Sequence, residues 1–511
     1  MNHSPILPIL IPFVASILLL IFSGRSFAWQ RGIAAVAAVV LIAVSVNLLL
    51  LTDQQAPLTY ALGEWSAPFG IILVADRLAA LGVMVTSILA AAALLYASSG
   101  FDQKGRHFHA IFQLQLVGIN GSFLTGDMFN LFVFFEVMLL ASYILLAHGG
   151  GLNKSRSGFA YVTLNLAGSA VFLIALGMIY GTLGTLNLAD IALQLQSVSA
   201  AEASLVRLAG ALLITVFLLK AAVLPLSFWL PHAYAAAGAP VAALFAIMTK
   251  VGIVAILRVQ MIAFEPAATT QGLVGDWLVI AALATIVFAA LGILTAKKLQ
   301  GLVAWLVLGS AGVLLIVPPL TDSSITAAGL YYLVQSAIVG AAFFMLAGLI
   351  SNARGQAEDS LIGIGRLSSN TLKIGFLVLA ATSAGLPPFS GFIGKLMLLY
   401  AASDTTMVSA IWLIVLASGL ITTVALAKAG SRLFWEIHSE GEAEAQEALP
   451  AKEPRQYIAT FSLVAVALLL VVFAQPVSDF TQRTAAQLHQ PEQYIQAVIP
   501  DHSAINRVTR P

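Results

Sequence analysis

The chain has 511 residues, of which 60% are hydrophobic and 9% are charged, with no cysteine and a formal net charge of +1. With a mean hydropathy of +0.96, it is too apolar for a soluble domain and is expected to be a polytopic membrane protein. The lack of cysteine excludes disulfides, iron–sulfur ligation and thiol catalysis by this chain, and neither its charge nor any basic tract points to nucleic acid.

Apolar runs of about 18 residues or more predict an all-α fold with about fourteen transmembrane helices. The first is not expected to be a removable signal peptide, because no positive charge precedes it while Arg25 and Arg31 follow it. The expected ranges are 5–23, 31–51, 71–98, 108–126, 128–148, 159–182, 205–224, 240–263, 274–296, 301–319, 325–350, 372–401 (broken), 407–434 and 457–475.

Lysine and arginine are concentrated in alternate connections between these ranges, from Arg25 and Arg31 near the start to Lys428 and Arg432 near the end. The intervening connections, such as 52–70, carry acidic residues but no lysine or arginine. By the positive-inside rule, the basic connections face the cytoplasm and both termini lie outside.

Two of the predicted helices are interrupted in matching ways. The run after Lys220 reads AAVLPLSFWLPHAY, and the run before Lys395 reads TSAGLPPFSGFIG. Proline removes a backbone donor, and in lipid the freed carbonyls must be satisfied by protein or water, so such breaks are expected to line a cavity. The breaking residues are Pro225, Pro231, Pro387 and Pro388.

The two breaks are five helices apart, which indicates two inverted five-helix repeats, helices 4–8 and 9–13, with sites near the midplane. Two unrelated proline kinks are the alternative. The expected divisions are an N-terminal three-helix segment (1–107), the first repeat (108–263), the second repeat (274–434), a cytoplasmic loop (435–456), a last transmembrane helix (457–475) and a polar tail (476–511). The loop and the tail are expected to be surface connections without chemistry of their own.

Four ionisable side chains lie inside long apolar runs: Glu136, Lys220, Lys250 and Lys395. A charge at a helix centre costs about 3 kcal/mol on insertion, so three lysines and one carboxylate indicate a cation or proton path. Harmless snorkelling of a lysine near a helix end is the alternative, chiefly for Lys395. Desolvation disfavours an ammonium and a nearby carboxylate favours it, so separating Glu136 from Lys220 would release a proton toward Lys250.

His232 follows Pro231 in the cytoplasmic connection, where it could load protons or play a structural role. No metal site, cofactor or enzymatic activity is expected, because the sequence contains no metal-ligand cluster, phosphate-binding loop or nucleophile elbow. An ammonium repels a bare cation, so a path of lysines favours protons over Na⁺.

Three segments resemble a known family: TGDMFNLFVFFEVMLLASY (125–143), LPLSFWLPHAYAAAGAPVAALFAIMTKVG (224–252) and GLPPFSGFIGKL (385–396). They are similar to the antiporter-like subunits shared by Mrp-type multisubunit cation/proton antiporters and respiratory complex I, and most of all to the D-type subunits of the Mrp antiporters. The resemblance covers essentially the whole hydrophobic chain. It implies that Glu136 is the family's helix 5 glutamate, Lys220 its helix 7 lysine, Lys250 its helix 8 relay lysine and Lys395 its helix 12 ionisable group.

The chain departs from this family between Lys250 and Lys395, where many relatives carry a histidine in helix 10 and ionisable residues in helix 11. Ser310 and Gln335 stand in these regions instead. Either water bridges the gap, or the half around Lys395 works separately. The residues expected to line such a water path are Ser310, Tyr331, Tyr332 and Gln335.

The resemblance implies a proton-translocating subunit of a multisubunit Na⁺(K⁺)/H⁺ antiporter in a bacterial inner (plasma) membrane. Its partners would be antiporter subunits of the A, B, C, E, F and G types, with H⁺ and Na⁺ or K⁺ as substrates. One alternative is a proton-pumping antiporter-like subunit of complex I or a membrane hydrogenase, with the redox activity on partner subunits. The other is a mainly structural subunit whose path is vestigial.

Overall fold

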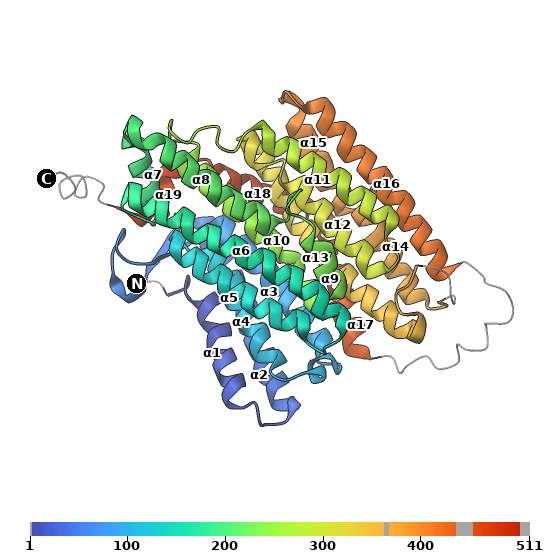
Figure 1. Cartoon of the computed structure of the whole chain (residues 1–511). Helices are drawn as coiled ribbons and strands as arrows, with labels where there is room; N and C mark the ends of the chain where they lie inside the picture. Colours follow the sequence, from blue (N-terminus) through green and yellow to red (C-terminus); the bar gives the residue numbers. More distant parts are fainter. Residues whose placement is uncertain (1–2, 362–366, 436–452, 501–511) are drawn as a thin grey trace.

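The computed structural model describes residues 3–361, 367–435 and 453–500. They form a bundle of long helices that run side by side (Figure 1). These ranges contain two regular strands, β1 (Leu58–Ala61) and β2 (Ile72–Ala75). The two strands pair antiparallel as a hairpin before the third long helix. The expected all-α polytopic fold is therefore confirmed, with this hairpin as a small addition.

Each range expected to be a transmembrane helix contains a helix in the structure. The first half consists of α1 (Leu7–Ile21), α2 (Phe27–Gln54), α3 (Arg77–Ala97), α4 (Phe108–Leu124), α5 (Met128–Ala147), α6 (Leu152–Leu183), α7 (Leu188–Gln194), α8 (Ala200–Ala221), α9 (Trp229–Ala236) and α10 (Ala239–Val259). The second half consists of α11 (Asp276–Thr295), α12 (Leu299–Leu314), α13 (Ser323–Arg354), α14 (Asn370–Ala384), α15 (Ser390–Ala401), α16 (Val408–Phe434), α17 (Pro454–Val472), α18 (Ala474–Leu488) and α19 (Pro491–Val498). Eleven helices of the described ranges are long and apolar enough to cross a membrane.

Burial separates the central helices from the peripheral ones. The apolar window of α10, which continues into a π-helical turn at Gln260–Phe264, is 100% buried, whereas that of α16 is 28% buried. A helix that is apolar all round lies in a protein core or faces lipid. α10 is therefore central and α16 peripheral, and α13 packs between α10 and the pair α14 and α15.

Both expected helix breaks are present. α8 ends at Ala221 and α9 begins at Trp229, so Pro225 lies in the first break. α14 ends at Ala384 and α15 begins at Ser390, so Pro387 and Pro388 lie in the second break. Pro231 lies in the first turn of α9, a position where a helix tolerates proline because that N–H has no partner in the helix.

The range 476–511, expected to be a polar tail, contains α19 and most of α18 in its described part. Phe480, Thr484 and Leu488 recur every four residues on one buried face of α18, and this face packs against α13. Because the other face is polar, a search for long apolar runs does not detect such a helix. α19 and the start of α1 lie at the same end of the bundle, on the left in Figure 1.

Candidate functional site

Lys220 lies in the last turn of α8, immediately before the first helix break. Its side chain is buried, and Nζ donates a 3.2 Å hydrogen bond to Oδ1 of Asn165 on α6. The carboxyl end of a helix carries the negative end of its dipole, which stabilises a cation. The backbone of Lys220 therefore lies at the negative end of α8, while its ammonium is bound by α6.

Glu136 lies on α5 and is partly buried. Its Oε1 accepts a hydrogen bond from the hydroxyl of Ser169 on α6. Among the described residues there is no direct ion pair between Glu136 and Lys220, which are joined instead through Ser169 and Asn165. The two polar residues of α6 were not identified from the sequence, although their spacing of four places them on one face of a helix.

Lys250 is completely buried on α10. Its Nζ donates a 3.0 Å hydrogen bond to Oγ of Ser310 on α12, and this Oγ lies 2.7 Å from the carbonyl oxygen of Val307. Ser310 is therefore the direct partner of the buried lysine.

A cavity of about 40 Å³ lies beyond Ser310, between α12, α13 and α14. One water needs about 10–15 Å³ and two to four polar partners, so the cavity has room for about two or three waters. The Oε1 of Gln335 is buried there and has no hydrogen-bond partner among the residues that the structure describes. The polar residues of the lining are Ser310, Tyr332, Gln335, Ser336, Thr382 and Ser383. Tyr331, also expected in the lining, instead donates its hydroxyl to the carbonyl of Leu470 on α17 at 2.9 Å.

Lys395 lies on α15, just after the second break, and reaches back across it. Its Nζ donates to the carbonyl oxygens of Ser383 at 3.2 Å and Ala384 at 3.0 Å, the last two residues of α14. Since Ser383 also lines the cavity, the contacts run from Lys250 through Ser310 and the cavity to Ser383 and Lys395. The ammonium of Lys395 therefore sits at the carboxyl end of the half-helix α14.

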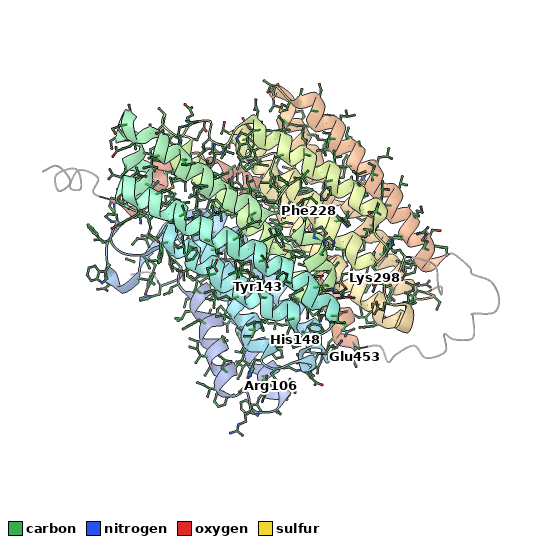
Figure 2. The ribbon with its side chains drawn as sticks, viewed as in Figure 1. Arg106, Tyr143, His148, Phe228, Lys298 and Glu453 are labelled. Atoms are coloured by element: carbon green, nitrogen blue, oxygen red, sulfur yellow. The ribbon has the colours of Figure 1, made fainter. Side chains whose placement is uncertain are left out.

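His232 does not belong to this group of residues. It is exposed on α9, and Nδ1 lies 3.0 Å from the carbonyl oxygen of Phe228. Phe228, next to the first break, lies nearer the middle of the bundle, whereas His148, Lys298 and Glu453 gather at its lower right end (Figure 2).

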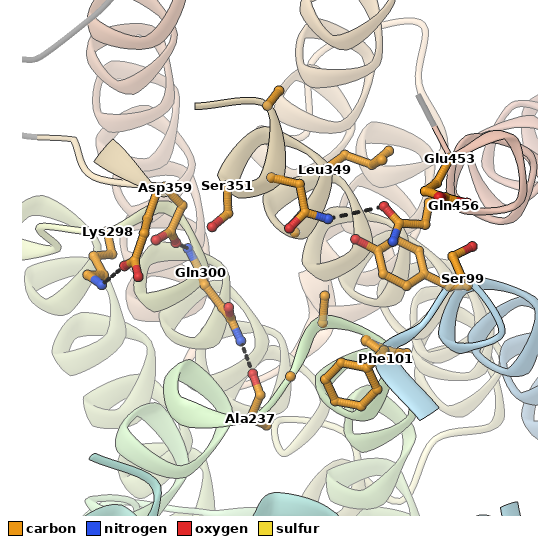
Figure 3. Close-up of a pocket in the computed structure, with 18 of the residues that line it drawn as sticks. Ser99, Phe101, Ala237, Lys298, Gln300, Leu349, Ser351, Asp359, Glu453 and Gln456 are labelled. Atoms are coloured by element: carbon orange, nitrogen blue, oxygen red, sulfur yellow. Dashed lines mark hydrogen bonds and ion pairs between the residues drawn. The ribbon is translucent and has the colours of Figure 1, made fainter. Parts of the chain in front are cut away.

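A larger cavity of about 1240 Å³ opens at this end, among the ends of α3, α12, α13 and α17 (Figure 3). Asp359 is almost completely buried there and accepts a 2.7 Å hydrogen bond from the backbone N–H of Gln300. Burial raises the pKa of this carboxyl group. The side chain of Gln300 donates to the carbonyl oxygens of Tyr234 and Ala237 on the α9 side. No sequence pattern indicates this cavity, because Asp359 stands in an ordinary polar connection.

Comparison with known proteins identifies the family of the chain. Residues 125–422 match the family model described as NADH:quinone oxidoreductase/Mrp antiporter, TM. The chain is 37% identical, over 98% of both chains, to a protein of Rhizobium meliloti (strain 1021) named as a probable K⁺/H⁺ antiporter subunit of type D. It is 35% identical to the Na⁺/H⁺ antiporter subunit of the same type from Bacillus subtilis (strain 168), over 98% of this chain and 100% of that protein.

A chain in the solved structure of the Mrp complex from Dietzia sp. DQ12-45-1b superposes with a TM-score of 0.87 at 26% identity, covering 98% of this chain and 100% of that one. The family match spans more than half of the present chain and includes all four ionisable residues of the candidate site. The chain therefore belongs to the NADH:quinone oxidoreductase/Mrp antiporter transmembrane family, on its branch of D-type Mrp antiporter subunits.

Proposed function

We propose that this chain is the proton-translocating subunit of a multisubunit Na⁺(K⁺)/H⁺ antiporter in a bacterial plasma membrane, with both termini outside. The observation that carries the proposal is the row of buried polar contacts across the bundle. Glu136 and Lys220 each bind a polar side chain of α6, Lys250 binds Ser310, and the small cavity separates Ser310 from the half-helix end that binds Lys395.

The residues of this row favour protons as the transported species. Three of the four charged groups are lysines, and an ammonium repels a bare metal cation while it can release and recapture a proton. A buried charge is stabilised only by partners in its immediate surroundings. Na⁺ or K⁺ would therefore be bound by other subunits, and this chain would carry the proton side of the exchange.

These contacts support each transfer step except that from Lys220 to Lys250, which no hydrogen bond of the described residues joins. When Glu136 approaches Lys220, the carboxylate stabilises the ammonium; when it withdraws, the dry surroundings favour the neutral amine and a proton leaves toward Lys250. The Ser310 hydroxyl can accept from the protonated Lys250 and donate to the neutral amine. Waters in the cavity would connect Ser310 to the end of α14, which replaces the ionisable groups that many relatives have there.

The family of this chain indicates which proteins it assembles with. The Mrp structure that this chain resembles is a complex, and the relatives are named as antiporter subunits. We therefore infer that this chain works with other Mrp-type subunits. The protein is a secondary transporter subunit, and any redox reaction would belong to other subunits.

The test is cation-dependent exchange in everted vesicles that contain the whole complex, comparing the wild type with Glu136→Ala, Lys220→Ala and Lys250→Ala. A pH-sensitive dye reports Na⁺- and K⁺-dependent proton movement, and immunoblots with native gels report assembly. We expect each variant to assemble and to lose exchange, and the cation that drives the wild type best names the substrate. Wild-type exchange in Lys220→Ala would contradict the proposal and favour a structural subunit.

A further inference from the structure

α6 separates the carboxylate of Glu136 from the ammonium of Lys220. This helix packs against α5, which carries Glu136, and against α8, which carries Lys220. Ser169 Oγ donates to Glu136 and also lies 3.0 Å from the carbonyl oxygen of Asn165. Asn165 Oδ1 accepts from Lys220 at 3.2 Å. Each charge thus has a neutral partner on α6 in place of the opposite charge.

The orientation of these neutral partners is fixed by their surroundings. Asn165 Nδ2 donates to the carbonyl oxygen of Tyr161 at 2.9 Å, so the amide must present its oxygen to Lys220. The hydroxyl of Tyr161 is bonded at 2.8 Å to Ser142 on α5, and its ring stacks on Trp229 of α9. Asn165 is 1% exposed, so its amide cannot form hydrogen bonds with bulk solvent instead. The acceptor that faces Lys220 is therefore oriented within α6, and the side chain of Tyr161 joins this part of α6 to α5 and α9.

We propose that Asn165 and Ser169 are positioning residues that hold Glu136 and Lys220 apart, and that both hydrogen bonds must break before the two charges can meet. This inference rests on the proposed function, because it concerns the approach and withdrawal of the same two charges. Hydrogen bonds to charged groups are strong in a low-dielectric interior. The separated arrangement is then a stable state. The strength of its two hydrogen bonds determines the pH at which Glu136 and Lys220 form the closed pair.

The other titratable groups around the pair are few. Tyr143 of α5 lies within electrostatic range of Glu136, and its buried hydroxyl has no partner among the described residues. Tyr161 of α6 is engaged with Ser142. On α10, which packs against α8, Lys250 is bonded to Ser310. A change in the pH dependence of exchange on altering α6 would therefore report the Glu136 and Lys220 pair.

The test is the pH profile of exchange for the assembled complex carrying Ser169→Ala or Asn165→Leu. Without its neutral partner, each charge has only the opposite charge to bind, so the closed pair is favoured and Lys220 retains its proton more strongly. We expect the pH of half-maximal exchange to rise by about one unit, the lower end of the range for a close opposite charge. Ser169→Thr, which keeps the hydroxyl, should restore the wild-type profile.

Ser87→Ala is the matched control, because Ser87 is also a buried helical serine bonded to the carbonyl four residues earlier, on α3. A lower rate at every pH with an unchanged midpoint in Ser169→Ala would show a merely structural role and overturn the inference. If Asn165→Leu does not assemble, Ser169→Ala decides alone. Loss of exchange in Lys220→Ala together with a wild-type profile in Ser169→Ala rejects this inference but keeps the proposed function. Wild-type exchange in Lys220→Ala rejects both.

Discussion

Lys250 and Ser310 are joined by a 3.0 Å hydrogen bond between α10 and α12, in a part of the core where Lys250 is 0% exposed and Ser310 is 7% exposed. A buried ammonium needs a partner for its protons, and this serine is the one that the described structure provides. The hydroxyl also faces the small cavity. Ser310 thus stands between a buried lysine and a space that can hold water.

Ser310→Ala removes this partner without adding bulk. A hydrogen bond to a charged group contributes about 1.5–3 kcal/mol, so exchange should fall by about tenfold or more. Ser310→Thr, which retains the hydroxyl, should keep most of the activity. The measurement is the initial rate of proton movement in vesicles with matched amounts of assembled complex. An unchanged rate in Ser310→Ala would exclude the serine from the path.

Gln335→Leu removes a polar group from the lining of the small cavity. The group is the buried amide oxygen of Gln335, which has no partner among the described residues. The lining keeps its other polar residues but loses this acceptor, so it holds water less firmly. We therefore expect exchange to fall while the complex still assembles. Thr215→Val is a suitable control, because Thr215 is exposed on α8 and bonds only the carbonyl of Ala211 in the described structure. Equal exchange in the two variants would mean that the halves around Lys250 and Lys395 work separately.

Lys395→Met leaves the carbonyls of Ser383 and Ala384 without the donor that bonds them in the structure. A buried acceptor left unpaired costs about 1–3 kcal/mol, so the thermal stability of the purified complex should fall along with exchange. Lys395→Arg keeps N–H donors for these two carbonyls, but an arginine does not release a proton. It should therefore preserve the thermal stability of the complex better than it preserves exchange. If Lys395→Met lost neither stability nor exchange, the lysine would be a side chain that snorkels without function.

Gly391→Ala tests the packing of the second break. A Cβ at Gly391 would lie 1.8 Å from the carbonyl oxygen of Thr382, on the facing half-helix. Backbone must move to relieve such a contact, and the cost is about 3 kcal/mol or more. We expect little assembled complex in immunoblots. Gly177→Ala on α6 meets no atom within 4 Å and should assemble normally, so equal losses in both variants would contradict this packing.

Asp102 supplies a prediction outside the membrane core. It is buried just beyond the end of α3, where it accepts bonds from Arg31 at 2.7 and 2.8 Å and lies 3.0 Å from Nε2 of His109. Burial would raise the pKa of this carboxyl, but the bonds from Arg31 and His109 outweigh it and hold the pKa at about 2. The contribution to stability is therefore complete above about pH 4 and is lost as pH falls through about 2.

Asp102→Asn should lower the free energy of unfolding by about 2 kcal/mol, less than for a fully buried pair because Arg31 is 23% exposed. The wild type should be the more stable of the two throughout the interval between about pH 5 and pH 8 in thermal denaturation of the complex. A difference that disappears within this interval would show that Asp102 is not ionised there.

The helices and the four buried charges could be predicted because each leaves a local signal. A long apolar run has few alternatives to a membrane helix, and a charge inside it is conspicuous. The partners of those charges left no such signal. Asn165 and Ser169 are small polar residues of the kind that occur throughout membrane helices, and only the packing of α6 against α5 and α8 gives them a role.

Two other features depended on tertiary structure. The face of α18 that contains Phe480 is recognisable only when α13 is there to cover it. His232 stood beside a proline break and suggested a proton entry, but the direction of a side chain on a short helix is set by the packing of that helix. The structure leaves it exposed, and its role in proton entry stays a prediction.

The position of Lys395 affects how relatives can be compared. Lys395 is attached after its break, yet its ammonium binds the carboxyl end of the half-helix before the break. A long flexible side chain can reach this point from either side of the gap. In an alignment, a relative without lysine in the column of residue 395 would still supply the charge if a lysine stood a few columns earlier. Such relatives should be compared by where the charge lies in space, since the column alone would classify them as inactive.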